Sequence, residues 1–157
     1  MNRKATVAAL GLLGVLHAYI VARHLPASAA THFDFSGRAN GFMSPSIFFW
    51  FMAALYAVIT AGFTLIPIGW MKIPNKAYWL APERRSETED YIGRNYGNMG
   101  LCTQLFMMAI TWTIQEANRL NPPHLSNTFF FIVFIFIDYA IVWKVIFYLR
   151  FRRELHR

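Results

Sequence analysis

The chain has 157 residues and a formal net charge of +7, and 56% of its residues are hydrophobic while only 15% are charged. Soluble domains average about 25% charged residues, so this composition excludes an ordinary soluble domain, and the many aliphatic and aromatic residues exclude a disordered chain. A basic chain can bind nucleic acid, but this one has no groove-reading motif. Its long apolar runs indicate a membrane protein instead.

Four apolar stretches predict transmembrane helices over about residues 5–23, 46–71, 95–118 and 125–149. About 20 apolar residues suffice to cross a hydrocarbon core as a helix, and a helix satisfies its own backbone hydrogen bonds in lipid. The last stretch contains Asp138 and Lys144, but its phenylalanines face in every direction, which suits lipid or protein neighbours. We therefore predict an all-α membrane protein with a single transmembrane domain over residues 1–157. Its expected architecture is a four-transmembrane-helix antiparallel bundle with a short cytoplasmic amphipathic helix.

The first stretch has an alternative interpretation as a signal peptide. Arg3 and Lys4 precede the apolar run, and residues 27–29 resemble a small-residue cleavage site. The run is long for a signal peptide, and Arg23 and His24 interrupt the approach to that site. We therefore expect a first transmembrane helix.

Lysine and arginine residues gather on one side of the predicted helices. One side receives eleven of them: Arg3, Lys4, Lys72, Lys76, Arg84, Arg85, Arg94, Arg150, Arg152, Arg153 and Arg157. The other side receives Arg23, Arg38 and Arg119 only. Because basic loops stay in the cytoplasm, this asymmetry predicts cytoplasmic termini and a cytoplasmic inner loop over residues 72–94. The outer loop then spans residues 24–45.

The outer loop is too long for a tight connection, and loops of this length are often functional. Phe33, Phe35 and Phe42 alternate with polar residues, so we expect the loop to fold back against the membrane surface. Residues 38–41, with the sequence Arg-Ala-Asn-Gly, predict a turn because Asn and Gly tolerate positive φ.

The inner loop is predicted to contain a surface helix from Pro82 to about Asn95. Proline suits the first turn of a helix, where its missing N–H would be unpaired anyway. Arg85 and Glu89 can form an i,i+4 ion pair worth about 0.2–0.5 kcal/mol. This helix is either a solvated connector or a docking surface for a partner. Aromatic residues suited to the membrane interface precede it: Trp70, Tyr78 and Trp79.

Two motifs occupy these loops. The outer-loop motif consists of Leu25, Pro26, His32, Phe33, Gly37 and Gly41, and the inner-loop motif of Pro74, Asn75, Lys76, Tyr78, Trp79, Pro82, Glu83 and Arg84. Together they resemble the signatures of a family of small bacterial membrane proteins of largely unknown function, which contains the N-terminal module of SdpI-like immunity proteins. Those proteins protect a cell from its own secreted membrane-active toxin, and they carry further transmembrane helices after this module. The resemblance implies an integral protein of the bacterial cytoplasmic (inner) membrane without a known cofactor.

Two polar side chains lie inside the predicted spans at similar depth. At 1.5 Å per residue, His17 lies about 18 Å and Asp138 about 17 Å from the cytoplasmic ends of their helices. A carboxylate near the bilayer centre costs at least about 2.5 kcal/mol, so Asp138 should face the helix bundle. We predict that His17 and Asp138 approach each other directly or through water. The pair would fix helix packing or relay protons, or Asp138 would pair with another subunit.

Small residues predict where helices approach closely. Ala53, Ala57 and Ala61 repeat at four-residue spacing, and Gly97 and Gly100 lie near the start of the third span. Small side chains allow close contact between helix backbones in lipid, where the hydrophobic drive for association is missing.

No catalytic constellation can be assigned, and no P-loop, zincin or dinucleotide fingerprint is present. His24, His32 and Asp34 could ligate a metal, but their spacing matches no compact helical site, so no metal and no cofactor are expected. We predict a non-catalytic protein that contacts the lipid bilayer and a membrane-protein partner or a second copy, and no nucleic acid. SdpI-like immunity or signalling is one version of this function. The alternatives are an accessory subunit of a larger complex, contacting lipid or pigment, and a small proton-coupled transporter.

Overall fold

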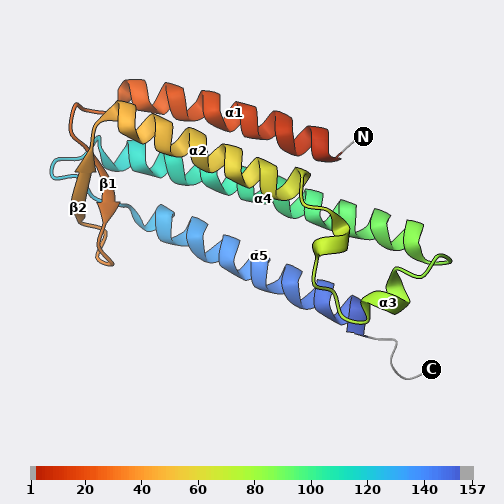
Figure 1. The fold of residues 1–157 in the computed structure, drawn as a ribbon. Coiled ribbons are helices and arrows are strands. Elements are labelled where there is room, and N and C mark those ends of the chain that lie inside the picture. Colours follow the sequence, from red (N-terminus) through yellow and green to blue (C-terminus); the bar gives the residue numbers. More distant parts are fainter. Residues whose placement is uncertain (1–2, 153–157) are drawn as a thin grey trace.

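The computed structural model describes residues 3–152, which form helices and one small sheet (Figure 1). The elements in chain order are α1 (Arg3–His24), β1 (Ala29–Phe33), β2 (Ala39–Met43), α2 (Pro45–Thr64), the 3-10 helix η1 (Ile68–Trp70), α3 (Lys76–Trp79), α4 (Arg85–Ala117) and α5 (Asn127–Arg152). The fold is mostly helical, as the sequence predicts. The two-stranded antiparallel sheet of β1 and β2 was not predicted.

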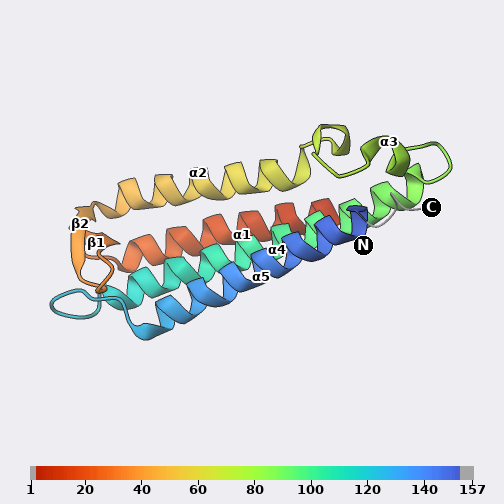
Figure 2. The same ribbon diagram turned by 90° about the horizontal axis from the view of Figure 1, so that it is seen from below.

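The long helices α1, α2, α4 and α5 run in alternating directions (Figure 1). We call one end of the molecule the α3 end, where α1 begins and α5 ends, and the opposite end the hairpin end, where β1 and β2 lie. Helix α1 packs along both α2 and α4, whereas α5 contacts α4 over a shorter stretch. Figures 1 and 2 both place α5 at one edge of the molecule, beside α4.

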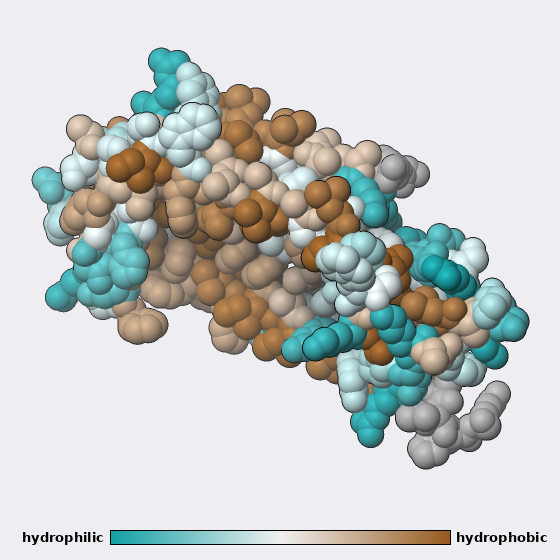
Figure 3. All heavy atoms as spheres, viewed as in Figure 1, coloured by the Kyte–Doolittle hydropathy of each residue, from teal (hydrophilic) through white to brown (hydrophobic). Residues whose placement is uncertain are grey.

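Three of the described helices are long and apolar enough to cross a membrane, namely α1, α2 and α5. Helix α4 does not meet that criterion, because it begins with charged residues and carries polar residues such as Asn98 and Gln104 further along. Large apolar side chains are exposed along the three apolar helices, for example Leu12 (73%), Val58 (69%) and Ile135 (67%). On the face drawn in Figure 3 hydrophobic residues fill the middle of the molecule, and hydrophilic residues gather at its two ends. This distribution is consistent with a membrane protein.

Helix α2 is shorter than the predicted span over residues 46–71. It ends at Thr64, and the chain continues through Pro67 into η1. A proline ring clashes with the backbone of a preceding helical turn and disfavours helical φ and ψ in the residue before it. Pro67 therefore accounts for the early end of α2.

The separate surface helix predicted over residues 82–95 is wrong, because α4 runs without a break from Arg85 to Ala117. Pro82 lies in the turn before α4, where the carbonyl of Ala81 accepts hydrogen bonds from the N–H groups of Arg84 and Arg85. No proline interrupts the segment that follows, so the helix continues into the apolar stretch. The predicted Arg85–Glu89 ion pair is confirmed, with 2.9 Å between Nε and Oε1.

The turn predicted over residues 38–41 is also wrong, because these residues belong largely to β2. The chain reverses over residues 34–38, where the Asp34 carboxylate accepts hydrogen bonds from the backbone N–H groups of Ser36 (2.8 Å) and Arg38 (3.0 Å). Gly37 adopts a φ of 84°, which few other residues tolerate. An Asp that binds the backbone two residues on is a common turn device, and here it moves the turn four residues earlier.

Two clusters of buried apolar side chains hold the fold together. The first joins α1, α2 and the hairpin: Ala18, Val21, Ala22, Leu25, Ala29, Phe48, Met52 and Tyr56. The second lies at the α3 end and fixes the end of α5: Ile73, Trp79, Ile92 and Phe151. Helix α5 is buried at its last turn, and along its middle it packs on α4, where the rings of Phe136 and Phe106 stack with centroids 4.0 Å apart.

The closest contacts between helices occur at glycines rather than at the predicted alanines Ala53, Ala57 and Ala61. Ala57 is exposed on α2, whereas a Cβ added to Gly14 of α1 would lie 2.2 Å from the Tyr56 ring. The prediction for α4 is supported, since a Cβ at Gly97 would meet the Arg3 side chain at 2.8 Å and one at Gly100 would meet Phe63 at 2.9 Å. Close contact between α1 and α2 thus depends on α1, whose glycines the sequence analysis did not single out.

Candidate ligand pocket at the α3 end

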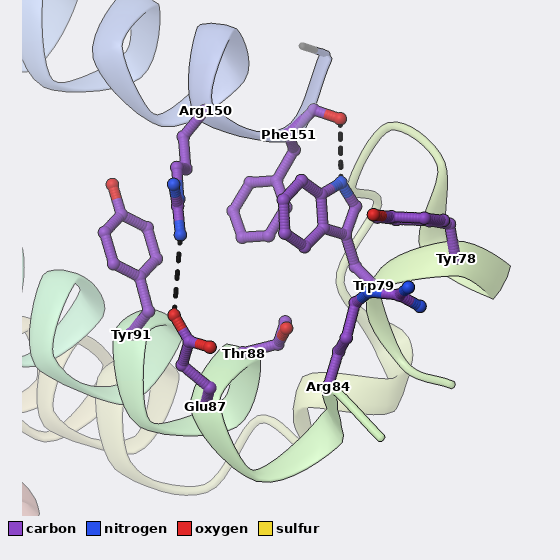
Figure 4. A pocket seen from close by; sticks show the side chains of 8 residues that line it. All are labelled: Tyr78, Trp79, Arg84, Glu87, Thr88, Tyr91, Arg150 and Phe151. Atoms are coloured by element: carbon purple, nitrogen blue, oxygen red, sulfur yellow. Dashed lines mark hydrogen bonds and ion pairs between the residues drawn. The ribbon is translucent and has the colours of Figure 1, made fainter. Parts of the chain in front are cut away.

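A polar pocket of about 260 Å³ lies at the α3 end, between α3, the start of α4 and the end of α5 (Figure 4). We call it the α3-end pocket. Its lining combines two arginines, one carboxylate, one hydroxyl group and four aromatic rings: Arg84, Arg150, Glu87, Thr88, Tyr78, Trp79, Tyr91 and Phe151. These residues come from segments that are far apart in the sequence.

Hydrogen bonds to the last turn of α5 position the aromatic wall of the pocket. The indole Nε1–H of Trp79 donates to the carbonyl oxygen of Phe151 at 2.9 Å, and the side-chain amide of Asn75 donates to the same oxygen at 3.1 Å. The last carbonyl groups of a helix have no partner inside the helix, so these donors satisfy an otherwise open acceptor. Trp79 and Phe151 are also nearly completely buried and meet edge to face, with ring centroids 5.4 Å apart.

Aromatic rings hold both guanidinium groups of the pocket. The Cζ atom of Arg84 lies 4.0 Å from the ring centroid of Tyr78. The Cζ atom of Arg150 lies 5.4 Å from the ring centroid of Trp79 and 5.5 Å from that of Tyr91. A cation placed over an aromatic face is attracted by the ring quadrupole. Such stacking orients a guanidinium while its N–H donors, at the edge of the plane, stay available.

Charge in the α3-end pocket is only partly balanced. The shortest approach of Arg150 to Glu87 is 3.7 Å, between Nη2 and Oε1, which is longer than a hydrogen bond. Both side chains are exposed, at 47% and 81%, so this ion pair contributes little to stability. The guanidinium of Arg84 forms no hydrogen bond or ion pair with another residue of the range 3–152. The pocket therefore holds two positive groups with spare donors against one loosely engaged carboxylate.

This arrangement suits binding of an anion better than covalent chemistry. Guanidinium groups match the geometry of carboxylate and phosphate oxygens, and Thr88 adds a nearly buried residue with a hydroxyl group to the same wall. Across residues 3–152, no group of three or more His, Cys, Asp or Glu side chains is placed to hold a metal ion. His24 and His32 make separate contacts, with the carbonyl of Ile20 and with Asn40.

The inner-loop motif contributes directly to the α3-end pocket. Tyr78, Trp79 and Arg84 line it, and Asn75 supports it from a left-handed backbone conformation with φ of 53°. Lys76 contributes indirectly, since its Nζ donates to the carbonyl of Gly69. The other members of the motif, Pro74, Pro82 and Glu83, do not line the pocket.

The outer-loop motif builds the hairpin instead. His32 and Gly41 are partners across the strands, and a Cβ at residue 41 would lie 2.8 Å from the His32 Cβ. The His32 ring nitrogen Nδ1 lies 2.5 Å from the side-chain oxygen of Asn40, a contact within the hairpin. Gly37 forms the turn and accepts a hydrogen bond from the N–H of Leu125 at 2.9 Å. The remaining members, Leu25, Pro26 and Phe33, follow α1 or lie in β1, and Leu25 is in the core.

The structure does not bring His17 and Asp138 together. None of the hydrogen bonds or ion pairs of the described residues joins them, and the ring nitrogen Nδ1 of His17 is buried without a partner. Asp138 is exposed on α5, while α1 packs against α2 and α4. The physical reason is the position of α5 at the edge, which places α4 between α5 and α1 (Figure 1).

Several residues of structural or site importance were missed by the sequence analysis. The α3-end pocket is completed by Arg150, Tyr91 and Thr88. Nothing in the sequence pointed to these three residues as pocket residues, apart from the presence of Arg and Tyr in segments expected at the membrane interface. Asn118 joins the end of α4 to β1 by accepting from the N–H of Ala30 and donating to its carbonyl, both at 2.8 Å. Gln104, fully buried, donates to the Thr60 hydroxyl at 2.8 Å, and its position on the inner face of α4 has no marker in the sequence.

Comparison with known proteins gives a limited result. The model of a family described as a domain of unknown function (DUF1648) matches residues 9–57, which cover most of α1, the hairpin and the first part of α2. This segment of the chain is thus similar to a family of unknown function. Searches of curated proteins and of solved structures found no match.

Proposed function

We propose that the chain is an integral protein of the bacterial cytoplasmic membrane that acts without catalysis, by binding a partner in or on the membrane. In this proposal α1, α2, α4 and α5 form an antiparallel bundle of four transmembrane helices. The hairpin then lies outside, and the α3 end and both chain ends lie in the cytoplasm. The excess of Lys and Arg at the α3 end supports this orientation.

The exposure of α5 is the observation that carries the proposal of a partner. Of its 26 residues only Phe151 is buried, and its exposed large side chains include Phe131 (68%) and Phe134 (65%). Helix α5 also forms an apolar groove with α4, of about 400 Å³, at the level of Phe106 and Phe136. Because α5 packs mainly on α4, it can accept another transmembrane helix along its remaining faces without disturbing the other three.

The packing of α4 supports its place as the fourth transmembrane helix. It packs extensively along α1 and also contacts α2, though less extensively. Three of its polar residues face protein: Gln104, Thr111 and Thr113 are nearly completely buried. Buried polar groups that are paired inside a helix group are compatible with the hydrocarbon region. Thr111 and Thr113 both donate to backbone carbonyls of the same helix.

The identity of the partner divides the proposal into versions. SdpI-like immunity or signalling rests on the outer-loop and inner-loop motifs and agrees with the match of residues 9–57 to a family of unknown function. An accessory subunit of a larger complex, contacting lipid or pigment, is the alternative that the free face of α5 favours. A small proton-coupled transporter is less supported, because Asp138 lies apart from His17.

Photo-crosslinking in living cells tests whether α5 meets a protein. A crosslinking amino acid such as p-benzoylphenylalanine replaces Phe131 or Ile135 in separate variants of the full chain. We expect one discrete protein product at both positions, of a mass that identifies a second copy or one partner. Val58 of α2 is equally exposed (69%) and serves as the control position, where that product should be absent.

Two results would contradict the proposal. Lipid adducts alone at positions 131 and 135 would mean that α5 faces the bilayer. The same protein products at position 58 would mean random collision in the membrane. Sensitivity of a deletion strain to a secreted membrane-active peptide would then separate the immunity version from the accessory-subunit version.

A further inference from the structure

We infer that the α3-end pocket binds a phosphate group, and that the phosphate of an anionic lipid in the cytoplasmic leaflet is one source of it. This inference rests on the proposed function for the orientation and depth of the pocket. The affinity of the pocket for phosphate follows from the contacts of its lining residues and does not depend on the orientation in the membrane.

The positive groups of the pocket are held ready to bind. Arg84 is stacked on Tyr78, and Arg150 is held between the rings of Trp79 and Tyr91, which themselves are fixed by the buried cluster at the α3 end. An arginine already ordered by its neighbours loses less conformational freedom when it binds a ligand. Both arginines line a cavity of about 260 Å³, which is large enough for a phosphate and part of its substituent. In Figure 4 the guanidinium of Arg150 is directed toward Glu87, and that of Arg84 lies beside Tyr78 on the other side of the pocket.

The ligand is an anion because of the charges in and around the pocket. Glu87, at 3.7 Å from Arg150, is too far to satisfy the guanidinium, and its side chain is 81% exposed. A phosphate can accept two hydrogen bonds from one guanidinium in a planar fork, as that of Arg150 offers. Arg84 adds a second positive charge to the lining of the same pocket. Glu87 competes with such a ligand for Arg150, so the carboxylate of Glu87 lowers the affinity of the pocket for phosphate.

The position of the pocket connects it with lipid. It lies where the apolar helix α5 ends, at one of the two hydrophilic ends of the surface in Figure 3, and the exposed Trp70 belongs to the same end. Trp and Tyr side chains favour the level of the lipid head groups. A pocket at that level meets lipid phosphates directly, and it also meets soluble phosphate esters from the cytoplasm.

Native mass spectrometry of the full chain in detergent tests this inference with two probes, phosphatidylglycerol and sn-glycerol 3-phosphate. Arg84→Gln/Arg150→Gln is expected to weaken retention of phosphatidylglycerol about tenfold or more, since the charge-assisted contact of Arg150 and the positive charge of Arg84 are lost. The control Arg85→Gln/Arg94→Gln removes the same charge from exposed positions outside the pocket and should leave retention unchanged. Displacement of the lipid by sn-glycerol 3-phosphate would identify soluble phosphate esters as ligands, whereas displacement by other anionic lipids alone would identify the lipid source.

A second variant keeps the inference testable if the double variant fails to fold. Glu87→Gln removes the competing carboxylate and should tighten retention of phosphatidylglycerol about threefold, an increase that misfolding cannot imitate. The inference is overturned if Glu87→Gln has no effect and both arginine pairs change retention equally, because attraction to the lipid would then be non-specific. If crosslinking at α5 succeeds but no pocket variant alters retention of phosphatidylglycerol, the phosphate-binding inference is overturned. The proposed function then still stands.

Discussion

Gly14 sets the distance between α1 and α2. A Cβ at this position would lie 2.2 Å from Cε1 of Tyr56, whose ring is fully buried. Gly14→Leu should therefore force the helices apart and destabilise the fold by about 1–3 kcal/mol, the usual cost of overpacking. The free energy of unfolding in mixed micelles measures the effect.

Gly62 provides the matched control on α2. A Cβ there meets nothing within 4 Å, so Gly62→Ala should leave stability unchanged or raise it by up to about 1 kcal/mol through better helix propensity. Equal destabilisation by Gly14→Leu and Gly62→Ala would show that the packing of α1 on Tyr56 is not what limits stability.

Asp34 makes the hairpin turn sensitive to acid. The hydrogen bond from the Ser36 side chain, together with the backbone hydrogen bonds from Arg38 and Ser36, lowers the pKa of Asp34 below its ordinary value of 3.8. The ionised carboxylate is thus favoured in the folded turn, and its contribution is present above pH 3.8 and lost as the pH falls through the lower folded pKa. Protection of the turn amides from hydrogen exchange should decrease in that range.

Ser36→Ala supplies the companion measurement for the turn. It removes the largest cause of the shift, so the pKa of Asp34, followed by the chemical shift of its carboxyl carbon, should rise toward 3.8. An unchanged pKa in this variant would mean that the backbone donors alone set the titration.

Between elements, one side chain connects the hairpin to α4. Asn118 makes two hydrogen bonds with the backbone of Ala30, a residue with no exposed surface. Asn118→Ala leaves the buried N–H and carbonyl of Ala30 unpaired and should cost about 1–3 kcal/mol, with faster amide exchange concentrated in β1. Asn95→Ala is the control, because among residues 3–152 the Asn95 side chain hydrogen-bonds to the Tyr91 carbonyl of its own helix, at 2.8 Å. Similar losses in the two variants would contradict a specific role of Asn118 in docking the hairpin.

For the whole molecule, the charge asymmetry predicts the orientation in the membrane. In a Cys102→Ala background, Ser36→Cys in the hairpin turn should react with an impermeant maleimide in intact cells. Ser86→Cys, at the start of α4, should react only after the membrane is opened. Both positions are exposed, so access decides the outcome. Labelling of residue 86 in intact cells would place the α3 end outside and reverse the proposed orientation.

The elements that depend on local composition could be predicted from the sequence. The apolar stretches that become α1, α2 and α5 were predicted with ends within a few residues, except where Pro67 ends α2 early. The Arg85–Glu89 pair was predicted because both partners lie on one helix, four residues apart. The hairpin was not predicted, since its turn depends on one side chain, Asp34, that accepts hydrogen bonds from backbone N–H groups.

Only part of the candidate site could likewise be predicted from the sequence. The inner-loop motif identified Tyr78, Trp79 and Arg84 as residues of interest, yet their partner Arg150 is contributed by the other end of the chain. The His17–Asp138 pairing was predicted from equal depth alone, and depth says nothing about which helices are neighbours. Only the packing of α5 beside α4 decides that.

The sequence by itself determined that this chain has membrane-type helices, because hydropathy and charge are sums over neighbouring residues. The tertiary structure decided which side chains meet. Trp79 and Phe151 are 72 residues apart and still share a hydrogen bond, because helices of fixed length and direction bring their ends to one place.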